Sequence, residues 1–443
     1  MGRDREEEET DMNDQPRRFL QRVWESVRQP PTVAASRAAD TLVALCDSLL
    51  SERGEVSGAR IAAEAMTAYQ QLTEAGRDAF FARLVDHYGA DANKVNLAID
   101  HYHANPTPSR LHELHVAAES RRQELFRRLN TAPGGIRTLV QMRADLLRTL
   151  DDSPERSIVD ADLVHVFRSW FNRGFLVLQR IDWRTSALIL ERLIQYEAVH
   201  QIQGWDDLRR RLEKDRRCYA FFHPALPDEP LIFIEAALTQ GLAGNVQALL
   251  DPRAPIADPA DARCAIFYSI TNCQLGLRGV SFGNFLIKQV VEDLSGEFRR
   301  LRKFATLSPV PGFRAWLSSH RTYMSEELAA LEVHDAPTLG KTAPGLKDEI
   351  LRLCAYYLLR AKRGRAPFDP VARFHLANGA RLARVNWLGD SSRAGIAASL
   401  GVTANYVYRI ADVEANHEAY AKDCRVVTSS TLERLAREVK VPA

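Results

Sequence analysis

The chain has 443 residues, of which 46% are hydrophobic and 26% charged, a composition that excludes a mostly disordered protein and predicts two globular domains. The 59 Lys and Arg residues nearly cancel the 57 Asp and Glu residues, so a net charge of +2 gives no attraction of the whole molecule to nucleic acid or to an anionic membrane. Its six cysteines are scattered and lack a C-x-x-C pair, which indicates a reducing compartment.

The N-terminal segment, residues 1–31, is charged, lacks periodicity and ends at a Pro-Pro pair, so we expect a flexible tail. Its acidic run Glu6–Glu9 differs from a secretory signal, and no apolar stretch is long enough to span a bilayer. We therefore expect a cytoplasmic protein without membrane association.

Residues 32–178 have the apolar spacing of α-helices. One apolar face repeats at i, i+3, i+4 and i+7, ahead of Gly54 as a stop, and comprises Leu42, Leu45, Cys46 and Leu49. Thr73 and Asp91 stand where N-caps belong, before further apolar positions. The sequence thus predicts an all-α N-terminal domain.

The pattern changes in residues 179–443. Segments rich in β-branched and aromatic residues predict four strands, at 219–222, 231–236, 265–270 and 304–307. Helical spacing is found at 282–298, between the last two strands, and again at 345–362. The Asn378-Gly379 pair suggests a hairpin over 373–387. An α+β domain is therefore expected after the helical one.

A glycine-containing loop lies between the strand at 265–270 and the helix at 282–298. Its glycines are Gly276, Gly279 and Gly283, and the free N–H groups of a helix start favour an anion such as a pyrophosphate. Arg278 and Lys288 could add positive charge. The spacing is neither G-x-G-x-x-G nor Walker A, and a tight turn that binds nothing stays an equal alternative on spacing alone.

Two other patterns are weak candidates for a ligand site. Gly340-Lys341-Thr342 resembles the end of a phosphate-binding loop, but Asp335 occupies the position of the first glycine. Four histidines cluster in sequence without the H-E-x-x-H spacing of a zinc site, namely His101, His103, His112 and His115. We interpret these histidines as surface residues and expect no metal.

Residues 396–408 have the glycine and apolar spacing of a helix-turn-helix, so a DNA-binding regulator is a competing hypothesis. A recognition helix there would carry Arg409 as its basic group, close to Asp412 and Glu414. Acidic residues repel phosphate, so we expect no nucleic-acid binding.

Several motifs together resemble the malonyl-CoA decarboxylase family over about residues 80–435. The two most specific are Ser308-Pro309-Val310-Pro311-Gly312-Phe313 and Phe374-His375-Leu376-Ala377-Asn378-Gly379-Ala380. Residues 169–176 and 217–219 match as well, and the loop 274–279 resembles the CoA-pyrophosphate loop of GNAT-type acyltransferases.

The resemblance implies a helical oligomerisation domain at 32–178 and a GNAT-fold catalytic domain at 179–443. It further implies a catalytic serine at Ser308, a catalytic histidine at His375 and an active-site tyrosine at Tyr408. The implied CoA-binding residues are Arg278, Gly279, Val280, Ser281, Phe282, Gly283 and Asn284. Some family members carry an acidic residue at the position of Ser281, so the contribution of that position is open.

The activity implied by the resemblance is conversion of malonyl-CoA to acetyl-CoA and CO2, in fatty-acid and malonate metabolism, by a homotetramer built as a dimer of dimers. No cofactor is implied, because CoA is part of the substrate. Decarboxylation leaves a thioester enolate, which needs a group that orients the carboxylate and a proton donor. A serine hydroxyl and an imidazole suit those tasks, whereas a GNAT acyltransferase, the main alternative, would need an amine acceptor.

Overall fold

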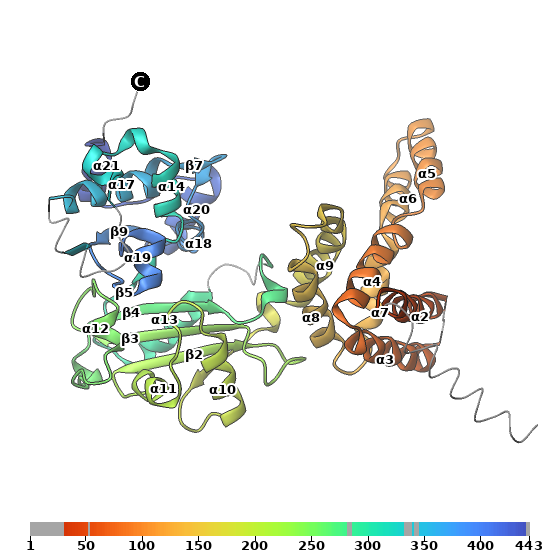
Figure 1. Cartoon of the computed structure of the whole chain (residues 1–443), viewed down its shortest axis with the longest axis horizontal. Helices are drawn as coiled ribbons and strands as arrows, with labels where there is room; N and C mark the ends of the chain where they lie inside the picture. Colours follow the sequence, from red (N-terminus) through yellow and green to blue (C-terminus); the bar gives the residue numbers. More distant parts are fainter. Residues whose placement is uncertain (1–30, 52–53, 281–285, 332–338, 341–344, 440–443) are drawn as a thin grey trace, which may run out of the picture. The chain divides into compact units, whose positions relative to one another are not determined.

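The computed structural model describes residues 31–51, 54–280, 286–331, 339–340 and 345–439, and the chain forms two compact units. The first unit comprises residues up to Trp170 together with Leu275–Val280, and the second comprises Phe171–Gln274 and the chain from residue 281 onward (Figure 1). Each unit has its own core.

The first unit is all helical. Its helices are α2 (Pro31–Ser51), α3 (Glu55–Gln71), α4 (Glu74–His87), α5 (Ala92–Ala104), α6 (Pro108–Ala118), α7 (Arg121–Leu129), α8 (Gly135–Leu147) and α9 (Ser157–Trp170). Thr73 and Asp91 are N-caps, as predicted, because their side chains accept backbone N–H groups of the first turns of α4 and α5. Helix α2 ends at Ser51, before the stop predicted at Gly54, and Gly54 is also the N-cap of α3.

The core of the first unit contrasts with its outlying helix pair. Phe80, Phe81 and Phe126 are buried, and Tyr69 packs edge-on against Phe80 at 6.0 Å between ring centroids. In α5, by contrast, only Ala98 is buried, and α6 buries no residue. The α5–α6 pair therefore extends from the other helices of this unit with apolar side chains exposed (Figure 1).

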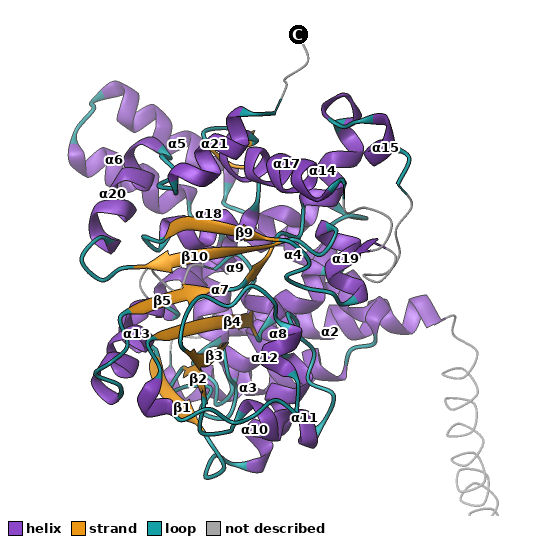
Figure 2. Ribbon diagram, turned by 90° about the vertical axis from the view of Figure 1, so that its left-hand side faces the viewer, coloured by secondary structure: helices purple, strands orange, loops and turns teal. Residues whose placement is uncertain are grey.

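The second unit is built on an eight-stranded sheet with the order β1-β2-β3-β4-β5-β10-β6, in which β9 also pairs with β10 (Figure 2). Its strands are β1 (Val177–Ile181), β2 (Arg216–Phe222), β3 (Ile232–Thr239), β4 (Cys264–Asn272), β5 (Lys303–Thr306), β6 (Ser308–Pro309), β9 (Arg381–Asn386) and β10 (Thr403–Tyr408). All pairs are antiparallel except β4 with β5.

Helices cover both faces of this sheet. The main ones are α10 (Ala187–Tyr196), α11 (Trp205–Arg211), α13 (Leu286–Glu297), α14 (Phe313–Ser319), α17 (Lys347–Arg360), α18 (Pro370–Ala377), α19 (Arg393–Ser399), α20 (Val413–Asp423) and α21 (Ser430–Arg437). Leu190 and Leu193 of α10 pack with Phe233, whereas α13 meets the opposite face, where Asp293 accepts the hydroxyl of Tyr219 at 2.7 Å.

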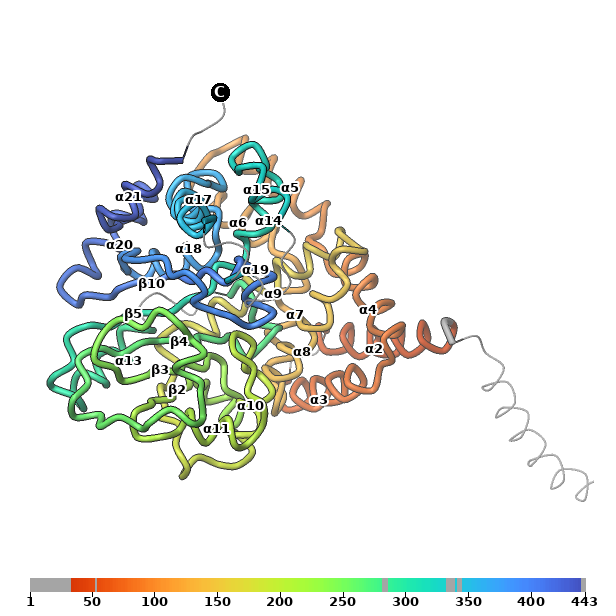
Figure 3. The backbone as a smooth tube through the Cα atoms, turned by 60° about the vertical axis from the view of Figure 1, so that its left-hand side comes forward, coloured from red at the N-terminus to blue at the C-terminus, as the bar shows by residue number. Residues whose placement is uncertain are grey.

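The predicted fold class, α+β with an all-α N-terminal region, is confirmed, and the parallel β4–β5 pair joined through α13 agrees with a GNAT-like domain. Figure 3 shows how β10, late in the chain, is inserted beside β5. The expected boundary at residue 178 falls within β1, and the helical unit ends at Trp170. No helix in the described part of the chain has the length and apolar character that a bilayer crossing requires.

The hairpin expected over residues 373–387 is wrong. Asp369 caps a helix that has Pro370 in its first turn, and α18 runs to Ala377 before β9 begins at Arg381. Asn378 and Gly379 end the helix, with Gly379 at φ +80°, instead of turning a hairpin. An Asn-Gly pair is common both in hairpin turns and at helix C-termini. The N-cap at Asp369 shows that here it ends a helix.

The helix-turn-helix resemblance also has a different structural basis. Residues 393–399 form α19, but the expected recognition helix is the strand β10, paired with β5, β6 and β9. Leu400 and Gly401, both with positive φ, end α19 and lead directly into the strand. The helix-turn-helix alternative therefore lacks its second helix, and the absence of DNA binding stays a prediction.

Candidate active site

Three predicted catalytic residues come together in the second unit. Ser308 lies on β6, His375 in the last turn of α18 and Tyr408 at the end of β10. Ser308 stands opposite Ala404, and Tyr408 lies four residues further along β10, so both side chains are on the same face of the sheet. His375 stacks on the ring of Tyr406, between these two positions. Helix α18 then supplies the imidazole.

The three side chains form a buried hydrogen-bonded chain. Ser308 Oγ lies 2.9 Å from His375 Nε2, and His375 Nδ1 lies 2.8 Å from the Tyr408 hydroxyl. Their exposed fractions are 5%, 3% and 3%. Residues separated by up to 100 positions in sequence thus make one continuous polar path.

Thr306 determines the direction of this hydrogen-bonded chain. The Ser308 hydroxyl donates to Thr306 Oγ1 at 2.8 Å, and the backbone N–H of Tyr406 donates to the same oxygen at 3.1 Å. Ser308 Oγ can then only accept from His375, so the imidazole proton is on Nε2. His375 Nδ1 is left as the acceptor of the Tyr408 hydroxyl.

The environment of His375 keeps its ring neutral. Burial lowers the pKa of His375 from 6.5 to about 3, because the charged imidazolium would lose its hydration. Burial likewise raises the pKa of Tyr408 well above its ordinary value, so its phenol stays protonated. The Tyr406 ring stacks on the imidazole at 4.6 Å between centroids. A neutral imidazole between two hydroxyls can pass a proton along the chain.

Asp369 holds the start of the helix that carries His375. Its Oδ1 accepts the N–H of Ala372 at 2.8 Å, and the Tyr357 hydroxyl donates to Oδ2 at 3.4 Å. Burial raises the pKa of this carboxyl to about 6. Asp369 therefore positions His375 through the helix and without touching the imidazole.

A small pocket adjoins Tyr408 within the second unit. It is lined by Lys288, Val291, Glu292, Asn378, Tyr408, Ile410 and Val413. Lys288 Nζ also lies 3.4 Å from a carboxylate oxygen of Glu414. Tyr408 thus lines this pocket while its hydroxyl bonds His375.

The predicted CoA loop is described in part. Leu275–Leu277 form a short 3-10 helix, and Gly279 has φ +77°, a left-handed conformation that favours glycine. A Cβ built at Gly279 would meet no described atom within 4 Å, so space is open beside it. Arg278, Gly279 and Val280 are described, whereas Ser281, Phe282, Gly283 and Asn284 lie outside the described residues.

The other sequence candidates do not form a ligand site among the described residues. No cluster of three or more His, Cys, Asp or Glu side chains there is arranged to hold a metal. His101 Nδ1 instead lies 2.9 Å from Glu113, on the α5–α6 pair. Of the loop-like Gly340-Lys341-Thr342, only Gly340 is described.

Sequence reasoning missed Thr306, Tyr406 and Asp369. Thr306 and Tyr406 have a retrievable signal, since each lies two residues before a predicted site residue on a strand and so shares its face. Asp369 could have been found as an N-cap followed by proline. None of the three belongs to a pattern that suggests chemistry by itself.

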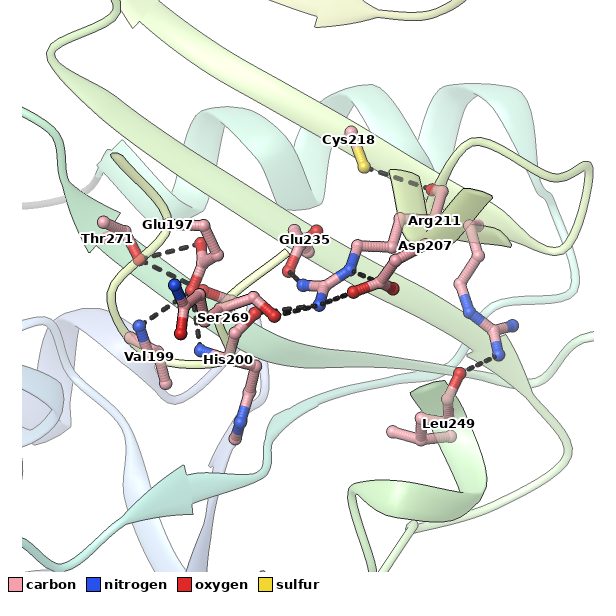
Figure 4. A network of polar contacts seen from close by, with 12 residues as sticks. Glu197, Val199, His200, Asp207, Arg211, Cys218, Glu235, Leu249, Ser269 and Thr271 are labelled. Carbon is pink, nitrogen blue, oxygen red and sulfur yellow. Dashed lines mark hydrogen bonds and ion pairs between the residues drawn. The ribbon is translucent and has the colours of Figure 1, made fainter. Parts of the chain in front are cut away.

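A second buried polar network lies on the sheet face below α11 (Figure 4). Arg211 bonds Glu235 at 2.8 Å and Asp207 at 3.0 Å, while Glu197 accepts the hydroxyls of Ser269 and Thr271. Burial raises the pKa of Glu235 to about 8 despite this pairing. Arg211 also donates to the carbonyl oxygen of His200, and Glu197 accepts the backbone N–H groups of Val199 and His200. The network therefore links loop backbone to helix and sheet, which is typical of a structural role.

Comparison with known proteins identifies the family. Residues 174–442 match the malonyl-CoA decarboxylase C-terminal domain and residues 88–171 match the N-terminal domain of the same enzyme. The chain is 37% identical to "Malonyl-CoA decarboxylase, mitochondrial" of Anser anser anser over 68% of this chain, and the alignment covers 66% of that relative.

Solved structures agree with this result. Malonyl-CoA decarboxylase from Rhodopseudomonas palustris superposes with a TM-score of 0.86 at 48% identity, covering 89% of this chain and 99% of that one. The enzyme from Agrobacterium vitis gives a TM-score of 0.81 at 46% identity with the same coverage. Matched along both units and by relatives above 30% identity, this chain belongs to the malonyl-CoA decarboxylase family.

Proposed function

We propose that the protein is a carboxy-lyase that converts malonyl-CoA to acetyl-CoA and CO2. Family membership supports this reaction and its substrate. The observation that carries the proposal is the buried path Ser308–His375–Tyr408, with its contacts of 2.9 and 2.8 Å. The path combines a hydroxyl for the carboxylate with a proton donor for carbon.

Ser308 orients the malonyl carboxylate in the proposed mechanism. Its hydroxyl turns from Thr306 to the carboxylate and holds the breaking carbon–carbon bond perpendicular to the thioester plane. The bond then breaks, CO2 leaves, and the electron pair enters the thioester as an enolate. Orientation of this kind is realised chiefly in the transition state, so it contributes to turnover more than to binding.

His375 protonates the enolate carbon from Nε2. Since the imidazole starts neutral, loss of this proton would leave an unstable imidazolate, and the Tyr408 hydroxyl prevents that by donating its proton to Nδ1. Tyr408 recovers a proton through the pocket that it lines. The proposed reaction uses no metal and no organic cofactor.

The CoA part of the substrate is assigned to Arg278–Asn284. Support comes from the left-handed Gly279, the open space beside it and the helix α13 that follows. In this chain the position of Ser281 offers a hydroxyl and no acid, so protonation of the enolate carbon is assigned to His375.

The proposal includes a homotetramer, a dimer of dimers, with the helical unit as its oligomerisation domain. The exposed apolar residues of α5 and α6 support self-association: Leu97, Leu111 and Val116 are 55%, 52% and 56% exposed. We place the enzyme in the cytoplasm, in fatty-acid and malonate metabolism. Its described cysteines are all free thiols, as a reducing compartment requires.

One incubation tests the proposed reaction. Purified protein is given malonyl-CoA labelled with ¹³C in the free carboxyl, with and without an amine acceptor. We expect acetyl-CoA and labelled CO2 in equal amounts in both mixtures. Formation of an acylated amine without labelled CO2 would instead identify an acyltransferase.

A further inference from the structure

Residues 275–280 are built into the helical unit, against α8. Gly276 lies so close to this helix that a Cβ placed on it would stand 1.8 Å from the carbonyl oxygen of Val140. No side chain fits at that distance, so position 276 requires glycine. The residues just before the predicted CoA contacts are therefore held by a helix more than 130 positions earlier in the chain.

Arg143 of α8 makes this attachment specific. Its Nη1 donates to the carbonyl oxygens of Gly276 at 2.7 Å and Arg278 at 2.8 Å, and its Nε donates to Asp160 at 2.8 Å. The side chain is 3% exposed. Hydrogen bonds from a charged donor are stronger than neutral ones. The two N–H bonds of Nη1 hold both carbonyls at once, because the guanidinium is planar and rigid.

The orientation of the Arg278 carbonyl determines that of the next N–H group. Because a peptide unit is planar and trans, the N–H of Gly279 points away from the carbonyl that Arg143 holds. Gly279 also has the left-handed backbone and the open space described above. Arg143 thus directs a backbone donor to the open side of the loop, where an anion can approach.

We propose that Arg143 is a positioning residue for the CoA pyrophosphate, acting through the backbone of Gly276 and Arg278. This inference rests on the proposed function, which supplies CoA as the ligand. It gives the helical unit a second task besides self-association, namely to hold part of the substrate-binding loop in its binding conformation.

The test compares two buried arginines of the same unit. Arg143→Met removes the donors to the loop. Arg122→Met removes a guanidinium that pairs with Asp162 at 2.7 Å and donates to the carbonyl oxygens of Leu84 and Val85, away from residues 275–280. Calorimetry measures the Kd for CoA, and turnover of malonyl-CoA gives KM and kcat. We expect Arg143→Met to raise Kd and KM at least about tenfold, since donors from a charged group are lost, with kcat at saturation nearly unchanged.

Arg122→Met should lower thermal stability but leave the Kd for CoA at its wild-type value. If Arg143→Met does not fold, Arg143→Lys replaces it in the test. This variant keeps the positive charge and one donor, so we expect it to fold and to show a smaller rise in the Kd for CoA. Equal Kd values for wild type, Arg143→Lys and any folded Arg143→Met would overturn the inference. Failure of the wild-type protein itself to bind CoA would refute the proposed function instead, so the two failures are distinguishable.

Discussion

Burial determines what His375 can do at the scale of a single residue. An exposed histidine would be partly charged near neutral pH, and the sequence suggested a proton donor of that kind. Burial instead lowers its pKa to about 3, so the proton available to the substrate is the Nε2 proton of a neutral ring. The hydroxyls of Ser308 and Tyr408 then matter as the groups on either side of that ring.

This pKa makes folding stability depend on pH. In the unfolded chain residue 375 takes up a proton near pH 6.5, whereas the folded chain does so only near pH 3. Its contribution to stability is therefore present above about pH 6.5 and is lost as the pH falls toward 3. Urea unfolding at pH 7 and pH 4.5 should show a larger loss of stability for wild type than for His375→Asn. Parallel losses in the two proteins would show that the imidazole is not buried.

Removing the Tyr408 hydroxyl should slow turnover without weakening binding. Tyr408→Phe leaves Nδ1 of His375 without its donor, and we expect kcat to fall by about tenfold or more, with KM unchanged. Tyr219→Phe is the matched control, because that buried hydroxyl bonds Asp293, on α13, and touches no site residue. Steady-state kinetics of both variants is the test. Equal kcat values for Tyr408→Phe and Tyr219→Phe would show that Tyr408 is not part of the proton path.

At the scale of elements, strands with an unambiguous composition were predictable. β2 to β5 are runs of buried apolar and β-branched residues, and their positions agree with the prediction to within a few residues. Residues 403–408 belonged to the helix-turn-helix alternative because their apolar spacing fits both a helix and a strand. Pairing with three strands shows that they form β10. At 370–377 the N-cap Asp369 indicates a helix, and the Asn378-Gly379 pair that suggested a hairpin is the end of that helix.

The site was predictable only through the family resemblance. Ser308 precedes a proline and His375 stands near an Asn-Gly pair, and both contexts are typical of structural residues. Their 2.9 Å contact arises from the insertion of β10 between β5 and β6, a long-range pairing that local patterns do not encode. Thr306 and Asp369 gain their importance from the same tertiary arrangement.

The N-cap of α18 offers a test of how an element positions the site. Asp369→Ala removes the acceptor for the N–H of Ala372 and should cost about 0.5–2 kcal/mol of folding stability, with a fall in kcat as His375 shifts. Asp369→Asn keeps an acceptor oxygen, and because burial raises the Asp369 pKa to about 6, a neutral side chain suits this site. In thermal melts and in kcat, Asp369→Asn should be close to wild type, whereas Asp369→Ala should have a lower Tm and a lower kcat. Equal impairment of both variants would contradict the capping role.

At the scale of the molecule, the proposed function assigns different tasks to the two units. The second unit contains Ser308, His375 and Tyr408, while the first contains the loop residues Leu275–Val280 and the exposed α5–α6 pair. In the proposed function the helical unit contributes both to CoA binding and to self-association, so its removal should affect more than assembly.

Assembly is tested by mass in solution. Light scattering of the 49.9 kDa chain should give a tetramer, stable over a wide concentration range. The pair Leu97→Glu and Val116→Glu places charges on the exposed apolar residues of α5 and α6, and we expect a smaller species with intact secondary structure. A monomer for the wild-type chain, or a tetramer that survives both charges, would contradict this part of the proposal.

The most direct test of the account is the separation of kcat from KM in His375→Asn and Ser308→Ala. In the proposed mechanism both groups act on the malonyl moiety in the transition state, so each variant should keep KM near its wild-type value. General acid–base catalysis contributes about 10²–10⁴-fold, so kcat of His375→Asn should fall at least about a hundredfold, and Ser308→Ala should fall in the same direction by less. A folded variant of either kind that turns over malonyl-CoA at the wild-type kcat would show that the buried path Ser308–His375–Tyr408 is structural and that the chemistry lies elsewhere.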